Sequence, residues 1–205
     1  MNENNFPELS AIWDEARQQI ESGNINKAIE IYKYILVRYA DEQVAVEFAN
    51  AYLGDLYLTI KNLVLAEEHI RKAISLKPDN PGYRYILGFV YTRRERWNEA
   101  ISEFEIAVKH EPGNGEYLRG LGWAVHSGGD INRGLALLKE ANRLAPENTN
   151  ILADLAVAYM MIDADIAKIY AEKAIRLDPA NTFLQNVLKN VLIFRKQFKR
   201  YQRNN

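Results

Sequence analysis

Apolar positions along the chain recur mainly at intervals of three and four residues, which is the spacing of one face of an α-helix. Leu87, Gly88 and Tyr91 share such a face, and Ala100, Phe104 and Ala107 form a second one shortly afterwards. Proline and asparagine then follow, and these residues typically end one helix and begin the next. The pattern therefore predicts an all-α fold built from pairs of helices that short turns connect.

Several residue types recur with a period of about 34 residues, which indicates a repeat architecture. Pro78, Pro112 and Pro146 are each 34 residues apart, and Pro179 follows 33 residues later. Small residues keep the same period and would let the two helices of a pair approach closely; they are Gly54, Gly88 and Gly122, and Ala73, Ala107 and Ala141. We therefore expect five repeats, at residues 9 to about 46, 47–80, 81–114, 115–148 and 149–181.

Asparagine and aspartate occupy the predicted helix starts, where their side-chain oxygens can accept hydrogen bonds from free backbone N–H groups. Asn181 is one of them and predicts a further helix, from residue 182 to about 201. Lys189 stands where a sixth repeat would carry glycine, so we interpret this last helix as a cap on the array. The residues expected to cap second helices are Asn24, Asn62, Asp130 and Asp163, and those expected to cap first helices are Asn80, Asn114, Asn148 and Asn181.

The positions that recur in each repeat resemble the pattern of the tetratricopeptide repeat (TPR) family, most clearly over residues 81–114. The family's leading tryptophan is missing from every repeat, and Gly134 stands where the family has alanine. The resemblance implies a right-handed superhelical solenoid of antiparallel helix pairs, here one domain over residues 1–205. It also implies a non-catalytic scaffold that binds a peptide or helix of another protein in a concave groove.

The first helix of each pair lines the groove in this family, and several of its outward columns here carry aromatic residues. Tyrosine, tryptophan and arginine dominate the binding energy of protein interfaces. By resemblance, the candidate peptide-binding residues are Tyr52, Asp55, Tyr85, Phe89, Arg93, Arg119, Gly120, Trp123 and His126.

The stretch LRGLGWAVHSGGD, at residues 118–130, resembles a phosphate-binding loop because it holds four glycines. A dinucleotide site also needs a preceding strand, and no such pattern precedes Leu118. By its position in the repeat, Gly122 belongs with Gly54 and Gly88, where the two helices of a pair approach closely, and Gly128 and Gly129 lie in the turn between them. Gly120 falls on the groove face, where we expect a notch that admits a side chain of the partner.

Composition argues against catalysis. The chain has no cysteine, and its three histidines lie in different repeats without the spacing of metal ligands. We therefore expect no catalytic residue, cofactor, metal or small-molecule substrate. The N-terminus has neither the basic nor the apolar region of a signal peptide, and the default expectation is a cytoplasmic protein.

The net charge of −1 hides an asymmetry. Residues 1–178 hold 20 basic and 27 acidic residues, whereas residues 179–205 hold six basic and no acidic residues. This leaves two alternatives open beside the groove. The chain could form a homo-oligomer through the last helix or the groove, or the basic helix could contact an anionic surface, although nucleic acid and membrane are the less favoured partners.

Overall fold

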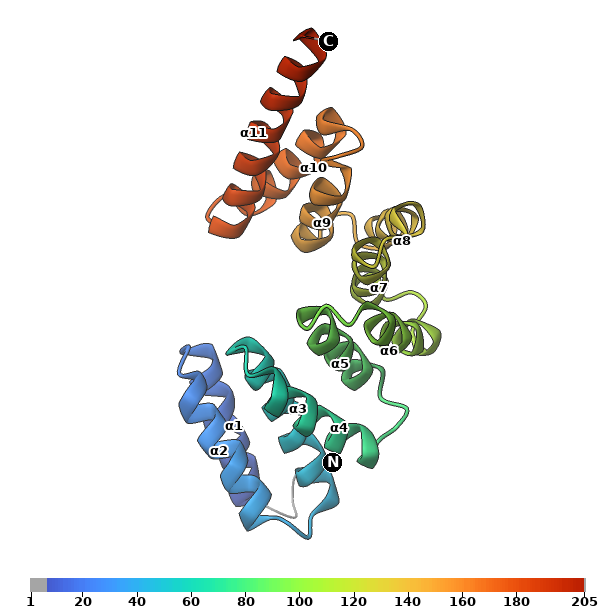
Figure 1. The fold of residues 1–205 in the computed structure, drawn as a ribbon. Helices are drawn as coiled ribbons and strands as arrows, with labels where there is room; N and C mark the ends of the chain where they lie inside the picture. The colour runs from blue at the N-terminus through green and yellow to red at the C-terminus, as the bar shows by residue number, and fades with distance from the viewer. Residues whose placement is uncertain (1–6, 205) are drawn as a thin grey trace. The chain divides into compact units, whose positions relative to one another are not determined.

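The computed structural model describes residues 7–204, and the side chains of that range except those of Pro7, Lys199 and residues 201–204. Eleven helices and no strand occur within this range, and turns of only three or four residues join consecutive helices (Figure 1). Such short connections make neighbouring helices antiparallel. None of these helices is both long and apolar enough to cross a membrane. The predicted fold class is therefore confirmed, an α-α solenoid of antiparallel helix pairs.

The helices form two compact units. Unit 1 ends at Arg96, and unit 2 begins at Trp97, so the boundary falls inside the repeat expected over residues 81–114. Unit 1 contains α1 (Pro7–Glu21), α2 (Ile25–Arg38), α3 (Gln43–Thr59), α4 (Leu63–Leu76) and α5 (Pro81–Arg93). Unit 2 contains α6 (Trp97–His110), α7 (Gly115–Ser127), α8 (Ile131–Leu144), α9 (Thr149–Tyr159), α10 (Ala164–Leu177) and α11 (Thr182–Asn204).

Each unit has an apolar core built from the periodic positions of its helices. Ile35, Leu53 and Ile70 are fully buried in unit 1, and Leu138 and Leu155 are fully buried in unit 2. Alanines of the repeat columns are buried beside them, because only a small side chain fits where two helices meet.

The asparagine and aspartate caps are confirmed at seven of the eight expected positions. Asn80 Oδ1, for example, accepts hydrogen bonds from the backbone N–H groups of Gly82 and Tyr83, at 2.9 and 3.4 Å. Asn24 is the exception, because its side chain makes no capping bond and instead donates to Gln19 Oε1 at 3.0 Å. The other six cap as predicted: Asn62, Asn114, Asp130, Asn148, Asp163 and Asn181.

The glycine columns mark places where two helix backbones nearly touch. A Cβ atom added at Gly122 would lie 3.0 Å from the backbone nitrogen of Leu138, so the close approach of α7 and α8 is confirmed. Gly134 comes closer still, since a Cβ atom there would lie 2.5 Å from the backbone nitrogen of His126. The departure of Gly134 from the family's alanine therefore reflects a tighter contact between these two helices.

In four of the five helix pairs, the turn between the two helices contains a residue in the left-handed region. Gly129 has a φ of 108°, as its predicted place in the α7–α8 turn requires, and Gly23 has a φ of 75° in the α1–α2 turn. Lys61 and Glu95 hold the equivalent places with φ values of 62° and 57°. Two repeats therefore accept a conformation that costs a side-chain-bearing residue about 1–2 kcal/mol.

We predict that Gly134→Ala lowers the free energy of unfolding by about 1–3 kcal/mol, because the added methyl group forces the α7 backbone away. Gly113→Ala is the matched control, since no atom lies within 4 Å of its added Cβ and its φ is not left-handed. Urea denaturation of both variants measures the difference. Equal stability of the two variants would contradict the close contact.

Gly129→Ala tests backbone strain instead of a steric contact, because no neighbouring atom lies within 4 Å of an added Cβ but the backbone has a positive φ. We expect the free energy of unfolding to fall by about 1–2 kcal/mol from this strain alone. The same denaturation series measures it, and a loss no larger than that of Gly113→Ala would show that the turn relaxes without cost.

Candidate functional site

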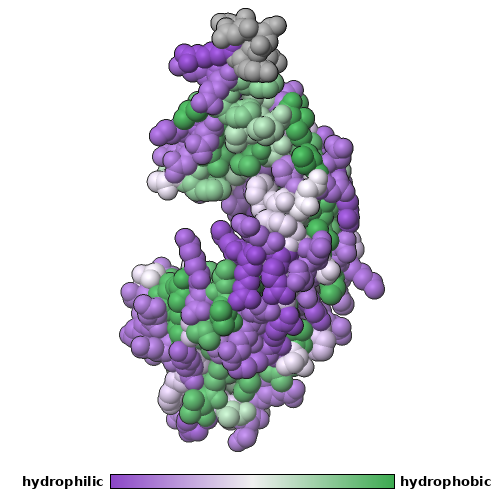
Figure 2. Space-filling model, in the orientation of Figure 1, coloured by the Kyte–Doolittle hydropathy of each residue, from purple (hydrophilic) through white to green (hydrophobic). Residues whose placement is uncertain are grey.

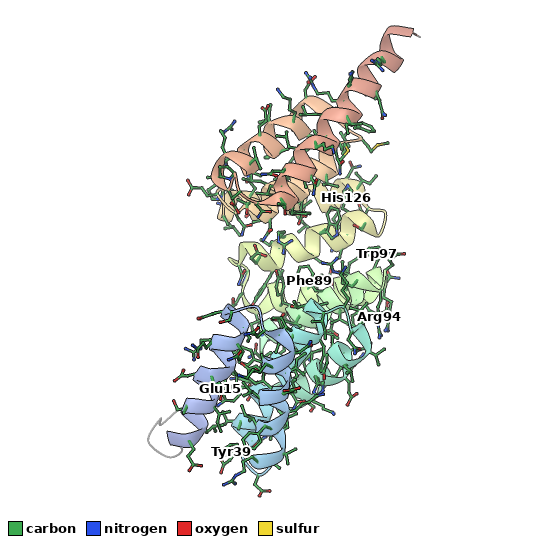
Figure 3. The ribbon with its side chains drawn as sticks, turned by 90° about the vertical axis from the view of Figure 1, so that its left-hand side faces the viewer. Glu15, Tyr39, Phe89, Arg94, Trp97 and His126 are labelled. Carbon is green, nitrogen blue, oxygen red and sulfur yellow. The ribbon has the colours of Figure 1, made fainter. Side chains whose placement is uncertain are left out.

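The nine residues predicted to bind a peptide lie on three first helices of the pairs, and the two units divide them into two sets. Figure 3 labels one residue of each set, Phe89 and His126. The unit 1 set is Tyr52 and Asp55 on α3, and Tyr85, Phe89 and Arg93 on α5; the unit 2 set is Arg119, Gly120, Trp123 and His126 on α7.

Tyr52 belongs to a cluster of four aromatic rings in unit 1. Its ring stacks on that of Tyr32, with centroids 4.9 Å apart and planes inclined by 5°. Trp13 lies against both, at 5.9 Å from Tyr52 and 5.4 Å from Tyr32, and Phe48 meets Trp13 edge-on at 6.5 Å. Tyr32 is buried, whereas 43% of Tyr52 is exposed. The cluster therefore holds one tyrosine ring in a fixed orientation at the surface.

Tyr32 was not among the predicted site residues, because it lies on α2, the second helix of its pair, and the family pattern places groove residues on first helices. Burial raises the pKa of its hydroxyl, and the nearby Tyr52 hydroxyl raises it further. Tyr32 therefore remains a neutral supporting ring beneath Tyr52 at physiological pH.

A second aromatic pair lies on α5. The rings of Tyr85 and Phe89 pack edge to face, with centroids 4.8 Å apart, and both residues are half-buried. Helix α5 is held against α3 by Tyr83, whose hydroxyl donates to Glu47 Oε1 at 2.7 Å. Both Tyr83 and Glu47 are buried, so this contact is shielded from solvent and fixes the two helices side by side.

We use the name aromatic face for the rings on the first helices of unit 1. Asp55 follows Tyr52 by about one helical turn, Arg93 ends α5, and both side chains are exposed. A surface with fixed rings and a few charged groups is suited to binding a partner's side chains rather than to acid–base chemistry. The aromatic face consists of Trp13, Phe48, Tyr52, Tyr85 and Phe89.

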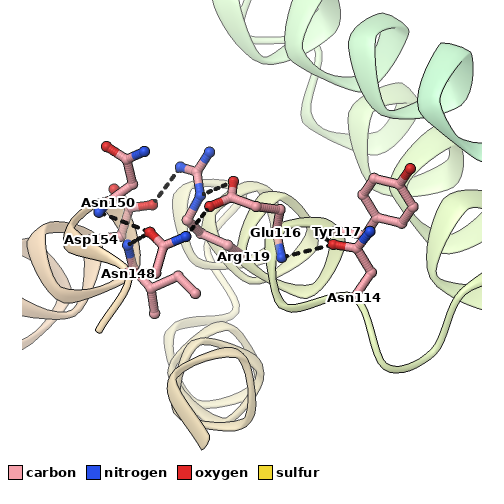
Figure 4. Close-up of polar contacts among 8 residues, drawn as sticks. Asn114, Glu116, Tyr117, Arg119, Asn148, Asn150 and Asp154 are labelled. Carbon is pink, nitrogen blue, oxygen red and sulfur yellow. Dashed lines mark hydrogen bonds and ion pairs between the residues drawn. The ribbon is translucent and has the colours of Figure 1, made fainter. Parts of the chain in front are cut away.

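Arg119, in unit 2, forms ion pairs within the protein (Figure 4). Its Nη1 donates to Asp154 Oδ2 and its Nε donates to Glu116 Oε2, both at 2.9 Å. Asn148 Nδ2 donates to the other oxygen of Glu116 at 2.5 Å, and only 14% of the Arg119 side chain is exposed. Burial raises the pKa of Asp154, and Arg119 opposes that rise. Arg119 therefore links α7 to α9, a role that the sequence pattern did not indicate.

The expected notch at Gly120 is not present. Gly120 is buried, and an added Cβ atom would lie 2.6 Å from Cε1 of the fully buried Phe104 ring. The ring of α6 occupies the space that helical phase alone assigned to a partner's side chain. The prediction that a partner's side chain enters at Gly120 is therefore wrong.

Trp123 and His126 stack on each other, with ring centroids 5.9 Å apart and planes inclined by 13°. Both are half-buried, and burial lowers the pKa of His126, which favours its neutral form at pH 7. Helix α7 of unit 2 therefore carries a pair of stacked, half-buried rings. Among residues 7–204, no group of three or more histidine or acidic side chains is arranged to hold a metal.

Comparison with known proteins agrees with this architecture. Residues 50–80 and 90–160 match two family models, both described as tetratricopeptide repeat. No curated protein sequence matches the chain.

Solved structures of similar fold include TTC0263, a thermophilic TPR protein of Thermus thermophilus. It is 19% identical, with a TM-score of 0.77 over 90% of this chain and 98% of that chain. YrrB, described as a TPR protein with an unusual peptide-binding site, is 19% identical, with a TM-score of 0.58 over 85% of this chain and 88% of that chain. The Cut9–Hcn1 structure is 19% identical, with a TM-score of 0.72 over 86% of this chain and 35% of that chain.

Identities of this size establish a shared fold alone. The recurring columns, the capped helix pairs and both family matches agree with it, and the chain belongs to the tetratricopeptide repeat family.

Proposed function

We propose that this protein is a non-catalytic scaffold that binds a peptide or helical segment of a partner protein on the aromatic face of unit 1. TPR folds generally serve as protein–protein interaction scaffolds. The observation that carries the proposal is Tyr52, an exposed ring that stacks on a buried ring beneath it.

A ring that is already fixed loses little conformational freedom when a ligand covers it, so more of the contact energy appears as affinity. Tyrosine also combines a large apolar surface with a hydroxyl that can hydrogen-bond to a peptide backbone. The ring cluster around Tyr52 fits an apolar or aromatic side chain of the partner, and the carboxylate of Asp55 favours a basic residue about one turn away.

The ring pair Trp123 and His126 offers unit 2 a smaller surface of the same type. Arg119 contributes less, because its guanidinium already binds two carboxylates. The space-filling view shows apolar residues at the surface of each unit, among charged and polar ones (Figure 2). The proposal therefore rests on unit 1.

We predict that Tyr52→Ala weakens binding of a selected peptide by about 2 kcal/mol or more, which is roughly 30-fold in Kd. Peptides are selected on the immobilised protein from a random phage-displayed library, and fluorescence anisotropy gives their Kd for each variant. Trp123→Ala, measured with the same peptides, shows whether unit 2 contributes.

Tyr34→Ala is the matched control, because Tyr34 is also an exposed tyrosine of unit 1 but lies on α2, outside the aromatic face. Its Kd should stay within about twofold of the parent value, as expected for a residue outside the interface. Thermal melts of both variants establish that they are folded. Peptides that bind Tyr52→Ala as tightly as the parent protein would overturn the assignment of the site.

A further inference from the structure

We propose that the free end of unit 2 docks onto an anionic lipid surface. The site is a set of protruding apolar side chains next to the basic C-terminal part of α11, and we refer to it as the basic tip. It shares no residue with the aromatic face, so this proposal is independent of the function proposed above. The basic tip consists of Met161, Ile162, Lys196, Phe198 and Arg200.

The apolar part of the basic tip comes from two elements. In the α9–α10 turn, 76% of Met161 and 50% of Ile162 are exposed, and on α11 40% of Phe198 is exposed. Phe198 follows the buried Val191 by seven residues, so it lies on the face by which α11 packs in its first half. It stacks on Phe194, with centroids 6.1 Å apart. The apolar face of α11 therefore continues beyond the helices that cover it.

An ion pair places the turn and the end of α11 together. Arg195 Nε donates to Asp165 Oδ1, which fixes α11 against the first turn of α10. Met161 and Ile162 come just before that turn, and Phe198 lies about 5 Å along the axis beyond Arg195. Figures 1 and 3 both show α11 projecting past the α9–α10 turn.

The charge on α11 itself has one sign, and the two acidic residues beside the α9–α10 turn already have partners within the protein: Asp163 caps α10, and Asp165 pairs with Arg195. Residues 179–205 contain six basic and no acidic residues. The side chains of Lys196 and Arg200 are exposed, whereas Arg195 is half-buried against Asp165. Basic residues beside insertable apolar side chains are the combination that attaches proteins to negatively charged lipid headgroups.

The shape of the basic tip favours lipid over a protein partner. Met161 protrudes from a turn and Phe198 from the end of a helix, and a protein would need a matching pocket for each. A headgroup layer receives protruding apolar side chains without such a match. The sequence alone disfavoured a membrane because it assigned the whole apolar stripe of the last helix to capping, and the structure shows that the stripe is only partly covered.

The test measures sedimentation of the full chain with vesicles of phosphatidylcholine and with vesicles that also contain phosphatidylglycerol. We expect binding only to the anionic vesicles, and weaker binding at high salt. The double variant Lys196→Glu, Arg200→Glu should lower the partition coefficient by about tenfold or more. Lys77→Glu with Lys109→Glu, a pair of exposed lysines elsewhere, makes the same charge change and should have a smaller effect.

Met161→Asp tests the apolar contribution and should also reduce binding by about tenfold. Its matched control is Val37→Asp, because 81% of Val37 is exposed but it lies on α2 in unit 1. Tyr52→Ala should bind the anionic vesicles like the parent protein, which separates this proposal from the peptide site.

Three results would overturn the proposal. One is equal binding to neutral and anionic vesicles, and another is equal loss in the test and control variants. The third is a parent protein that ignores vesicles but forms a dimer in light scattering that Met161→Asp dissociates, since the basic tip would then be a contact between two copies.

Discussion

The close approach of the two helices within a pair is the constraint on which the other features of this protein depend. A Cβ atom added at Gly54 would lie 3.0 Å from Cβ of Ile70 in unit 1, and one added at Gly122 would lie 3.0 Å from the backbone nitrogen of Leu138 in unit 2, so both places favour a residue without a side chain. Glycine fits at the point of closest approach, and larger buried residues such as Leu53 and Leu121 pack beside it. This packing fixes which positions of α3 and α7 face outward.

Equivalent columns of the repeats carry different chemistry in the two units. Tyr52 occupies in α3 the column that Asp154 occupies in α9. In unit 1 this column supports a stacked ring pair, and in unit 2 it anchors an arginine that links two helices. The architecture therefore fixes where the outward residues point, whereas the individual side chains determine whether a position is open to a ligand or used internally.

The features that spacing alone could predict are those that act within one repeat. The caps at Asn80 and Asn148 and the turn glycine Gly129 follow from local backbone needs, and the periodic columns identify them. Gly120 shows the limit, because phase gives the direction in which a position points but does not reveal that the Phe104 ring of another helix fills that space. The Arg119–Asp154 pair joins residues 35 positions apart, and no short-range pattern marks it. Asn24 failed as a cap because the nearby Gln19 offers its side chain another partner.

The glycines of α7 also bear on how this array could be lengthened or rebuilt by exchanging repeats. Gly120 accommodates a ring from α6, while Gly122 accommodates α8, whose Gly134 in turn accommodates the α7 backbone. A standard repeat inserted here would bring alanine or larger residues to at least two of these contacts, so it would collide with helices on both sides. Helices α6, α7 and α8 are therefore matched to one another, and we expect that they can be exchanged only together, as one unit of three helices.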